Sequence, residues 1–212
     1  MSYIAERRQE ERDRRRTEIV DAADTLYAEA GWDSITMDQV ARRARLSRAL
    51  VYVYFKDKSD LHLALVERAL GILRQRFETA RAGATSGLEE VEAIGRAYVA
   101  FPSELPHYFD ACVRYQARPV GDGEIDPNEA VCLAAGSRVH QCIVDALARG
   151  VADGSIRGDL GDLLATALAL WAFTHGVIQI ASSKGGQIEQ DGVPIPKFTE
   201  HALGLALRSL RP

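Results

Sequence analysis

The chain has 212 residues, of which 47% are hydrophobic and 26% are charged, and its formal net charge is −4. This composition is typical of a soluble globular protein of one domain or two small ones, and it excludes disordered, collagen-like and disulfide-dense proteins. The sequence contains no run of eighteen apolar residues that would predict a membrane span, and its Arg- and Glu-rich start does not resemble a secretory signal. The cysteines (Cys112, Cys132 and Cys142) form no CxxC pair, so we expect buried thiols in a reducing cytoplasm.

A charged arm of residues 1–13 opens the chain, and we expect it to be flexible because it lacks apolar periodicity. Beyond it, from about residue 14, apolar residues recur on one face of a helix that Gly31 ends. Those residues are Ile19, Ala22, Ala23, Leu26, Tyr27 and Ala30.

Two short helices and a longer one should follow. Thr36 and Gln39 have the spacing of a capping box at the start of the second helix. Ser47 is placed to cap a third helix that runs to about Phe55. Asp57 then opens a fourth helix through about Arg81. Residues 14–60 are therefore predicted to form a three-helix domain, followed by a second domain over residues 61–212.

The second domain also has helical periodicity throughout. We expect one helix from about Val91 to Phe101, ended by Pro102, and another over residues 105–118, closed by Pro119 and a turn at residues 121–123. Further helices are expected over residues 128–150, 162–183 and 197–210, with a loop over residues 185–196. The sequence has no period-2 strand of useful length, so it predicts an all-α protein of about nine helices.

The third helix has two different sides when it is drawn at 100° per residue. Val51 and Phe55 share the side that must pack against the preceding helices. The opposite side is a small apolar ridge between two phenols, preceded by Ser-Arg, which suits a helix lying in the DNA major groove. The alternative is an ordinary surface helix with two half-exposed tyrosines. The ridge consists of Ala49, Leu50 and Val53, flanked by Tyr52 and Tyr54.

The local charge of residues 36–58 supports DNA binding, although the net charge of the whole chain does not. Residues 36–58 hold six Lys or Arg and only two Asp, a local excess of +4 in a chain whose sum is −4. A local positive field steers a polyanion, although solvated faces with a similar excess also occur.

The segments from Gly31 to Ala41 and from Ala44 to Leu61, with Tyr-x-Tyr-Phe-x-x-Lys at residues 52–58, resemble the DNA-binding domain of tetracycline-repressor (TetR) family regulators. The resemblance covers about residues 14–67. It implies an N-terminal helix-turn-helix DNA-binding domain and a C-terminal helical domain for ligand binding and dimerisation. It further implies a homodimeric repressor that a small molecule releases from a palindromic operator.

The resemblance also implies roles for individual residues. Thr36, Tyr52, Tyr54 and Lys58 match positions that commonly contact phosphates, while Ser47, Arg48, Ala49 and Leu50 match positions at or near the bases. Arg45 occupies a turn position where the family usually has glycine and which tends to require a positive φ, so either Arg45 is strained there at a modest cost or the turn differs slightly. Leu50 and Val53 replace commonly polar residues, which favours thymine-methyl contacts with Arg48 as the main hydrogen-bonding reader. The expected DNA-contacting set is Thr36, Arg45, Ser47, Arg48, Ala49, Leu50, Tyr52, Val53, Tyr54 and Lys58.

The sequence of the C-terminal half predicts the architecture of this domain more clearly than the identity of its ligand. The helices Asp162–Ser183 and Lys197–Leu210 are expected to form the homodimer interface, with an intramolecular core helix as the alternative. A pocket for an apolar or aromatic effector is expected among aromatic positions, although aromatic residues at helical spacing are more often core and a histidine such as His175 is more often a hydrogen-bonded core residue. The candidate residues are Tyr98, Phe101, Tyr108, Cys112, Tyr115, Trp171 and His175.

Enzyme motifs are not found in the sequence. It contains no HExxH, no GxSxG and no glycine-rich phosphate loop after a strand. His140 and Cys142 point to different faces of a helix, so a zinc site would need other ligands. We therefore expect no catalytic residue, cofactor or metal. The alternative is a small all-α scaffold or catalytic domain that does not bind DNA.

Overall fold

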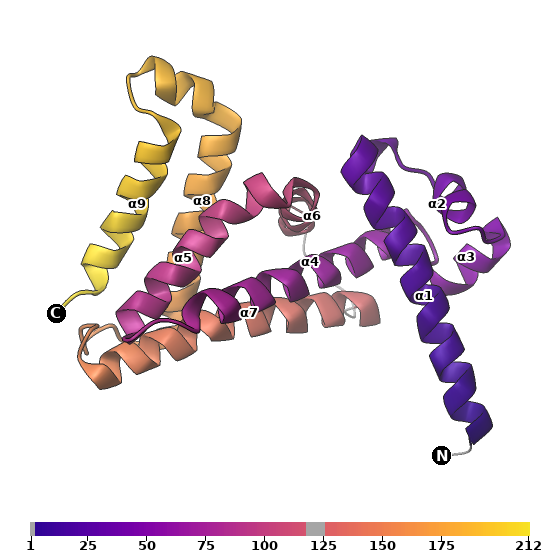
Figure 1. The fold of residues 1–212 in the computed structure, drawn as a ribbon, viewed down its shortest axis with the longest axis horizontal. Coiled ribbons are helices and arrows are strands. Elements are labelled where there is room, and N and C mark those ends of the chain that lie inside the picture. Colours follow the sequence, from indigo (N-terminus) through magenta and orange to yellow (C-terminus); the bar gives the residue numbers. More distant parts are fainter. Residues whose placement is uncertain (1–2, 118–125) are drawn as a thin grey trace. The chain divides into compact units, whose positions relative to one another are not determined.

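A computed structural model describes residues 3–117 and 126–212 (Figure 1). Within these residues the chain is helical and has no strand, as the sequence predicts. The elements are α1 (Tyr3–Ala30), the short 3₁₀ helix η1 (Trp32–Ser34), α2 (Met37–Arg43), α3 (Arg48–Tyr54), α4 (Lys58–Arg81), α5 (Gly87–Glu104), α6 (Pro106–Gln116), α7 (Pro127–Asp153), α8 (Leu163–Gln190) and α9 (Ile195–Leu210). The turn expected at residues 119–123 lies outside the described residues.

The helices fall into two units, and the division differs from the predicted boundary at residue 60. The first unit is Met1–Ala69 with Pro106–Cys132, and the second is Leu70–Leu105 with Leu133–Pro212. Helix α6 therefore belongs with the N-terminal helices, whereas the sequence placed it in the second domain. The reason is a pair of buried tyrosines: Tyr108 of α6 donates to Asp24 of α1 at 2.6 Å, and Tyr27 of α1 donates to Asp110 of α6 at 2.7 Å.

The core of the first unit is built from the predicted apolar face of α1. Ile19, Ala22, Ala23 and Tyr27 are buried as expected, whereas Leu26 is half-buried and Ala30 is exposed. They pack with the buried residues of the two short helices, of which Val51 and Phe55 were predicted to be on the inner side. These are Met37, Val40, Ala41, Val51 and Phe55.

Residues 3–13 of the N-terminal arm are helical in the structure, whereas the arm was expected to be flexible. Helix α1 begins at Tyr3 and continues without a break to Ala30. Arg and Glu have high helix propensity, and oppositely charged side chains three or four residues apart stabilise a helix. Arg14 and Arg15 both pair with Glu11, at 2.7 and 3.0 Å, which provides this stabilisation without any apolar face.

Two other helix ends were predicted too early. Helix α5 includes Pro102 and ends at Glu104, because the proline lies in the last turn and removes only one backbone hydrogen bond there. Helix α8 continues through Gly185 and Gly186 to Gln190, so most of the loop expected over residues 185–196 is helix. A glycine costs only about 1 kcal/mol in a helix, which the retained backbone hydrogen bonds can offset.

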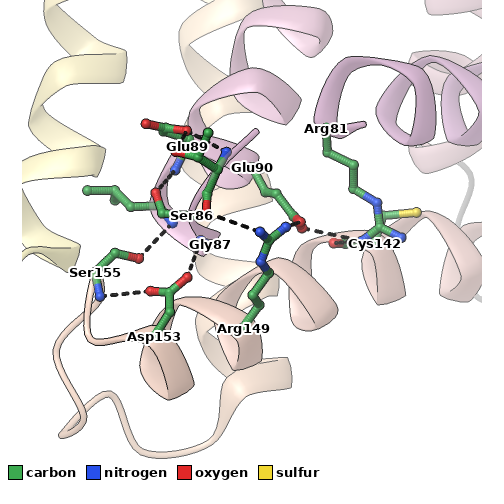
Figure 2. A network of polar contacts seen from close by, with 11 residues as sticks. Arg81, Ser86, Gly87, Glu89, Glu90, Cys142, Arg149, Asp153 and Ser155 are labelled. Atoms are coloured by element: carbon green, nitrogen blue, oxygen red, sulfur yellow. Dashed lines mark hydrogen bonds and ion pairs between the residues drawn. The ribbon is translucent and has the colours of Figure 1, made fainter. Parts of the chain in front are cut away.

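In the second unit, the start of α5 is fixed to the end of α7 by the polar network in Figure 2. The backbone N–H of Gly87 donates to Asp153 at 2.7 Å, and that of Leu88 donates to Ser155 at 3.1 Å. Ser86 caps the helix by accepting from the Glu89 N–H at 3.3 Å. The first N–H groups of α5 thus find partners in side chains, although no earlier turn of helix exists to accept them.

A buried carboxylate strengthens the same junction (Figure 2). Glu90 of α5 is 7% exposed and forms an ion pair with Arg149 of α7. Arg81, at the end of α4, lies 3.7 Å from the other oxygen of Glu90 and donates to the Cys142 carbonyl at 3.4 Å. Because a buried carboxylate needs charged partners, α4, α5 and α7 are held together at this end.

Glycine at position 87 is what permits the close approach of α5 to α7. A Cβ atom there would lie 2.0 Å from the backbone nitrogen of Gly150. We predict that Gly87→Ala lowers the free energy of unfolding by about 1–3 kcal/mol or more, because backbone must move. Gly136→Ala is the control, since a Cβ at this position in α7 meets nothing within 4 Å, and it should raise stability by about 0.5–1 kcal/mol. Urea unfolding followed by circular dichroism measures both, and equal stabilities would contradict the predicted clash.

Helix α8 is the most apolar helix and leaves much of that surface uncovered. By length and composition it could cross a membrane, whereas the sequence was interpreted as having no membrane span, and only 11% of its most apolar window is buried. Its exposed side has small residues along the centre and large apolar residues on both edges. The small residues are Ala165, Ala169, Ala172 and Gly176, and the large ones are Leu164, Leu168, Phe173 and Ile180.

Candidate DNA-binding surface

The start of α2 is fixed by the predicted capping box. The Gln39 N–H donates to the Thr36 hydroxyl at 3.2 Å, and the Thr36 N–H donates to the Gln39 side chain at 2.7 Å. Two N–H groups that the helix cannot satisfy internally are thereby paired. The entry of the chain into α2 is set locally, within four residues.

The turn between α2 and α3 depends on a left-handed residue. The Leu46 N–H donates to the Ala41 carbonyl at 2.9 Å, and the Arg45 N–H donates to the Arg42 carbonyl at 3.1 Å. These two bonds form a Schellman motif, which requires positive φ at the residue after the helix cap. That residue is Arg45, with φ of 57°, the only non-glycine residue with positive φ in the described part of the chain. Of the two alternatives for this turn, the structure has the strained Arg45 with positive φ.

Helix α3 has the two sides that the sequence predicts. Ser47 caps it by accepting from the Leu50 N–H at 3.2 Å, and Val51 and Phe55 are almost fully buried. On the opposite side Val53 is 71% exposed, and Ala49 beside it is also exposed. The remaining predicted contact residues lie around this side: Leu50 and Tyr54 are half-buried, and Tyr52 is exposed. A short capped helix therefore presents a small apolar ridge to solvent.

Arg48 lies at the start of this ridge and is restrained by two neighbours. Its Nε atom is 3.1 Å from an Asp38 carboxylate oxygen, and its guanidinium carbon is 5.5 Å from the centre of the Tyr52 ring. The Tyr52 hydroxyl and the Asp38 charge both favour the charged guanidinium and raise the pKa of Arg48. The sequence analysis missed Asp38. Its place in the first turn of α2 gave no sign that it would pair with the next helix.

Lys58 begins α4 and is held beside η1. Its Nζ atom lies 4.8 Å from the centre of the Trp32 ring and donates to the Asp33 carbonyl at 3.4 Å. Partial burial disfavours the ammonium ion and lowers the pKa of Lys58. An anion beside the ammonium would favour its charged form, and the free N–H groups at the start of α4 could share the same anion. Trp32 is a second residue that sequence reasoning did not identify.

The residues predicted to line an effector pocket are divided between the two units. Tyr108, Cys112 and Tyr115 lie on α6 in the first unit, where Tyr108 and Cys112 are core residues. Burial raises the pKa of the Cys112 thiol to about 12. Tyr98, Phe101, Trp171 and His175 lie in the second unit. The seven positions therefore do not form one cluster within either unit.

Three of the second-unit residues do come together. The Tyr98 hydroxyl is 2.7 Å from His175 Nδ1, and the rings of His175 and Trp171 are 5.6 Å apart. Gln179 lies 3.1 Å from the other nitrogen of His175, and burial lowers the pKa of this histidine. Tyr98 and Trp171 also line an apolar cavity of about 40 Å³, far smaller than the roughly 300–1,000 Å³ of a small-molecule site.

A larger groove lies elsewhere on the second unit, between α5, α8 and α9. Its volume is about 580 Å³, and most of its lining is apolar. Arg96 and Glu200 pair with each other on its wall, at 2.8 Å. The apolar part of the lining includes Val99, Ala100, Ile178, Ile195 and Leu203. None of these five residues was among the sequence-predicted ligand contacts. In the described residues no group of three or more His, Cys, Asp or Glu could hold a metal ion.

The capped turn and the exposed ridge of α3 define a helix-turn-helix unit of the kind that places its second helix in a DNA groove. Two family models agree with this assignment. Residues 19–65 match the model of bacterial regulatory proteins of the tetR family, and residues 91–194 match a tetracyclin repressor-like C-terminal domain. The chain belongs to the TetR family of regulatory proteins.

Several curated relatives match only part of the chain. The HTH-type transcriptional regulator HbdR from Aromatoleum sp. (strain CIB) is 34% identical over 77 residues, which is 36% of this chain and 34% of HbdR. For two further curated HTH-type regulators the matched segment covers 40% and 41% of their length.

Solved structures resemble the whole chain. A protein of unknown function from Rhodococcus sp. RHA1 is 23% identical, with a TM-score of 0.74 over 93% of this chain and 95% of that one. The transcriptional regulator FadR from Bacillus subtilis, in complex with stearoyl-CoA, is 15% identical, with a TM-score of 0.66 over 90% of this chain and 97% of FadR. At these identities the likeness establishes a shared fold.

The strained turn offers a direct test of this local geometry. Arg45→Gly should raise the free energy of unfolding by about 0.5–1 kcal/mol, because glycine adopts positive φ without steric cost. Arg42→Gly removes the same charge from a helical position of α2 and should lower the free energy of unfolding by about 1 kcal/mol. Urea unfolding compares the two variants. If Arg45→Gly were the less stable of the two, the turn would not have the left-handed geometry described.

Proposed function

We propose that this protein is a transcriptional repressor that binds a palindromic DNA operator and is released by an apolar small molecule. The observation that carries the proposal is the exposed ridge of α3, held outward by the capped turn. Small residues at Ala49 and Val53 allow close approach to base edges, as a helix in the major groove requires. The turn directs this side of α3 to solvent through its backbone geometry, with the positive φ at residue 45 that such a turn requires.

In this proposal, the side chains that recognise bases differ from those that bind backbone phosphates and position the helix. Arg48 reads a guanine edge through its fork of donors, and Leu50 and Val53 contact thymine methyl groups. Tyr52, Tyr54 and Lys58 hold phosphates on the walls of the groove, with the Thr36 hydroxyl and the Arg45 guanidinium at the rim. Ser47 and Ala49 lie near the bases. Asp38 keeps Arg48 close to its reading position before DNA arrives, because the ion pair restricts its rotamers.

Dimerisation is proposed to occur through α8 and α9. The exposed side of α8 would be costly in water, and a second copy would cover it with an equivalent apolar surface. Small residues such as Ala172 and Gly176 at its centre allow two helices to approach closely. Leu205 of α9 is also exposed and adds to the same apolar surface. A two-fold dimer presents two copies of α3, which matches two inverted half-sites.

The effector is proposed to bind the groove between α5, α8 and α9. Its volume of about 580 Å³ lies within the range of small-molecule sites, about 300–1,000 Å³. The apolar lining suits an aliphatic or aromatic molecule, and Arg96 could bind an anionic group in exchange for Glu200. The similarly folded FadR binds stearoyl-CoA, which supports an apolar chain as the kind of ligand. The ligand lowers DNA affinity only by its preference for the DNA-free arrangement, and DNA must weaken ligand binding by the same factor.

The DNA-binding proposal predicts two kinds of mutant. Arg48→Ala should relax sequence preference at one base pair of each half-site, at a cost of about 1–3 kcal/mol for the preferred base. Lys58→Ala and Tyr52→Phe should weaken binding to all sequences alike, and Lys58→Ala should lower the salt slope by about one per half-site. Selection of duplexes from a random pool, followed by anisotropy titrations at several salt concentrations, measures both effects. A uniform loss of affinity in Arg48→Ala with an unchanged selected site would refute its reading role.

The dimer proposal predicts a monomeric variant. Ala172→Arg puts a charge at the centre of the exposed side of α8 and should convert the dimer into a monomer that binds DNA at least ten-fold more weakly. Ala148→Arg makes the same change at an exposed position of α7 and should leave the dimer intact. Sedimentation equilibrium gives the mass of each variant. A wild-type monomer, or an Ala172→Arg dimer, would contradict the proposed interface.

A further inference from the structure

We propose that the first half of α1 carries a second DNA contact, in which an arginine face binds backbone phosphates beyond the segment that α3 reads. This inference rests on the proposed DNA-binding function and extends the same surface. The face consists of Arg8, Arg12, Arg15 and Arg16, and is called the arginine face below. It lies before residue 19, where the match to the family model begins.

The first half of α1 projects beyond the core of its own unit. Its buried residues begin only at Ile19, and residues 3–14 are all exposed. At about 1.5 Å per residue, residues 3–16 extend the helix by about 20 Å. Figure 1 shows this part of α1 continuing past α3 to the N-terminus as regular helix. A helix of this length without packing contacts has a surface available for a partner.

Charge on this projecting segment is segregated by face. At 100° per residue, the arginine face occupies a sector of about 100° that is aligned with Ile19 and Ala23, the core-facing residues further along α1. No acidic residue of the segment falls in that sector. The acidic residues, which lie on the other sides of the helix, are Glu6, Glu10, Glu11 and Asp13. The segment therefore presents only positive charge on the side toward which the rest of the unit packs.

The arrangement is unfavourable for the helix by itself. Arg12 has Arg8, Arg15 and Arg16 as neighbours at three or four residues, and like charges at these spacings destabilise a helix. In the described part of the chain Arg8 and Arg12 form no ion pair, whereas Arg15 pairs with Glu11 and Glu18. A polyanion binding along the row would remove this repulsion.

The arginine face also begins beside the end of the reading helix. The guanidinium carbon of Arg16 lies 5.6 Å from the centre of the Phe55 ring, at the residue that caps α3, and Arg16 pairs with Glu67 at 3.4 Å. Arg12 and Arg8 follow one and two turns further out, about 6 and 12 Å along the helix axis. Duplex DNA carries one phosphate charge per about 1.7 Å, so a row of this length spans several phosphates beside the half-site. Arginine binds phosphate through paired donors, which suits this contact.

The test is the double variant Arg8→Gln/Arg12→Gln, with Arg7→Gln/Arg14→Gln as the matched control. Both remove two charges from the same segment, and the control removes them from the opposite side of the helix. The probe is a duplex carrying the site that wild-type protein selects from a random pool, with either long or trimmed flanks. On long flanks we expect the double variant to bind about ten-fold more weakly, with a salt slope lower by about two per protomer, and the control to change by less than half as much. Trimming the flanks should weaken wild type and leave the double variant unaffected.

Thermal unfolding distinguishes a DNA contact from a structural role. The double variant should unfold at the same temperature as wild type or higher, because it loses only like-charge repulsion. Equal DNA affinities of the two double variants, or an equal response of both to trimmed flanks, would overturn the inference while the proposed function stands. Selection of no duplex by wild-type protein would overturn both. A loss of affinity accompanied by a lower unfolding temperature would assign the arginines to folding instead.

Discussion

The Schellman turn between α2 and α3 is the constraint on which the DNA-binding surface depends. Two backbone hydrogen bonds close this turn, and both need Arg45 in the left-handed region, with φ of 57°. An L-residue with a side chain pays a steric cost there, so the bonds and the packing of Val51 and Phe55 must hold it in place. Once those two residues are buried, the ridge around Val53 has to face solvent. The direction of the proposed reading helix thus follows from one turn and two buried side chains.

The charged side chains on this surface are restrained before any DNA is present. Arg48 lies between Asp38 and Tyr52, and Lys58 lies over Trp32. Restraint reduces the side-chain entropy that binding would otherwise cost, and partial burial of Lys58 strengthens its interaction with an anion. Asp38 also lowers DNA affinity, because its negative charge repels phosphates. The contacts that Arg48 makes with DNA must outweigh this repulsion. Such a balance favours sequence discrimination over raw affinity.

Local signals in the sequence predicted the helix-turn-helix well. The capping box at Thr36 and the cap at Ser47 each depend on residues within a few positions of one another, so no knowledge of the fold was needed. The special position of Arg45 was inferred instead from the family resemblance. The helical start of α1 could not be recognised from apolar periodicity, because ion pairs rather than burial stabilise it. Contacts between distant segments could not be predicted from the sequence either. Tyr108 has the spacing of a core residue whichever helix it packs against, and only the structure pairs it with Asp24. The same holds for Asp38 and Arg48, which are ten residues apart on different helices.

Cross-linking from the centre of the ridge tests directly whether α3 is the helix that contacts the DNA bases. Val53 is 71% exposed, so a diazirine-bearing aliphatic residue can replace it without disturbing the core. In complex with a selected duplex, this residue should form a photo-cross-link to a base within each half-site, whereas the same residue at Ala28, an exposed position of α1, should form none. A complex that forms normally but yields no base cross-link from position 53 would contradict the assignment of α3 as the reading helix.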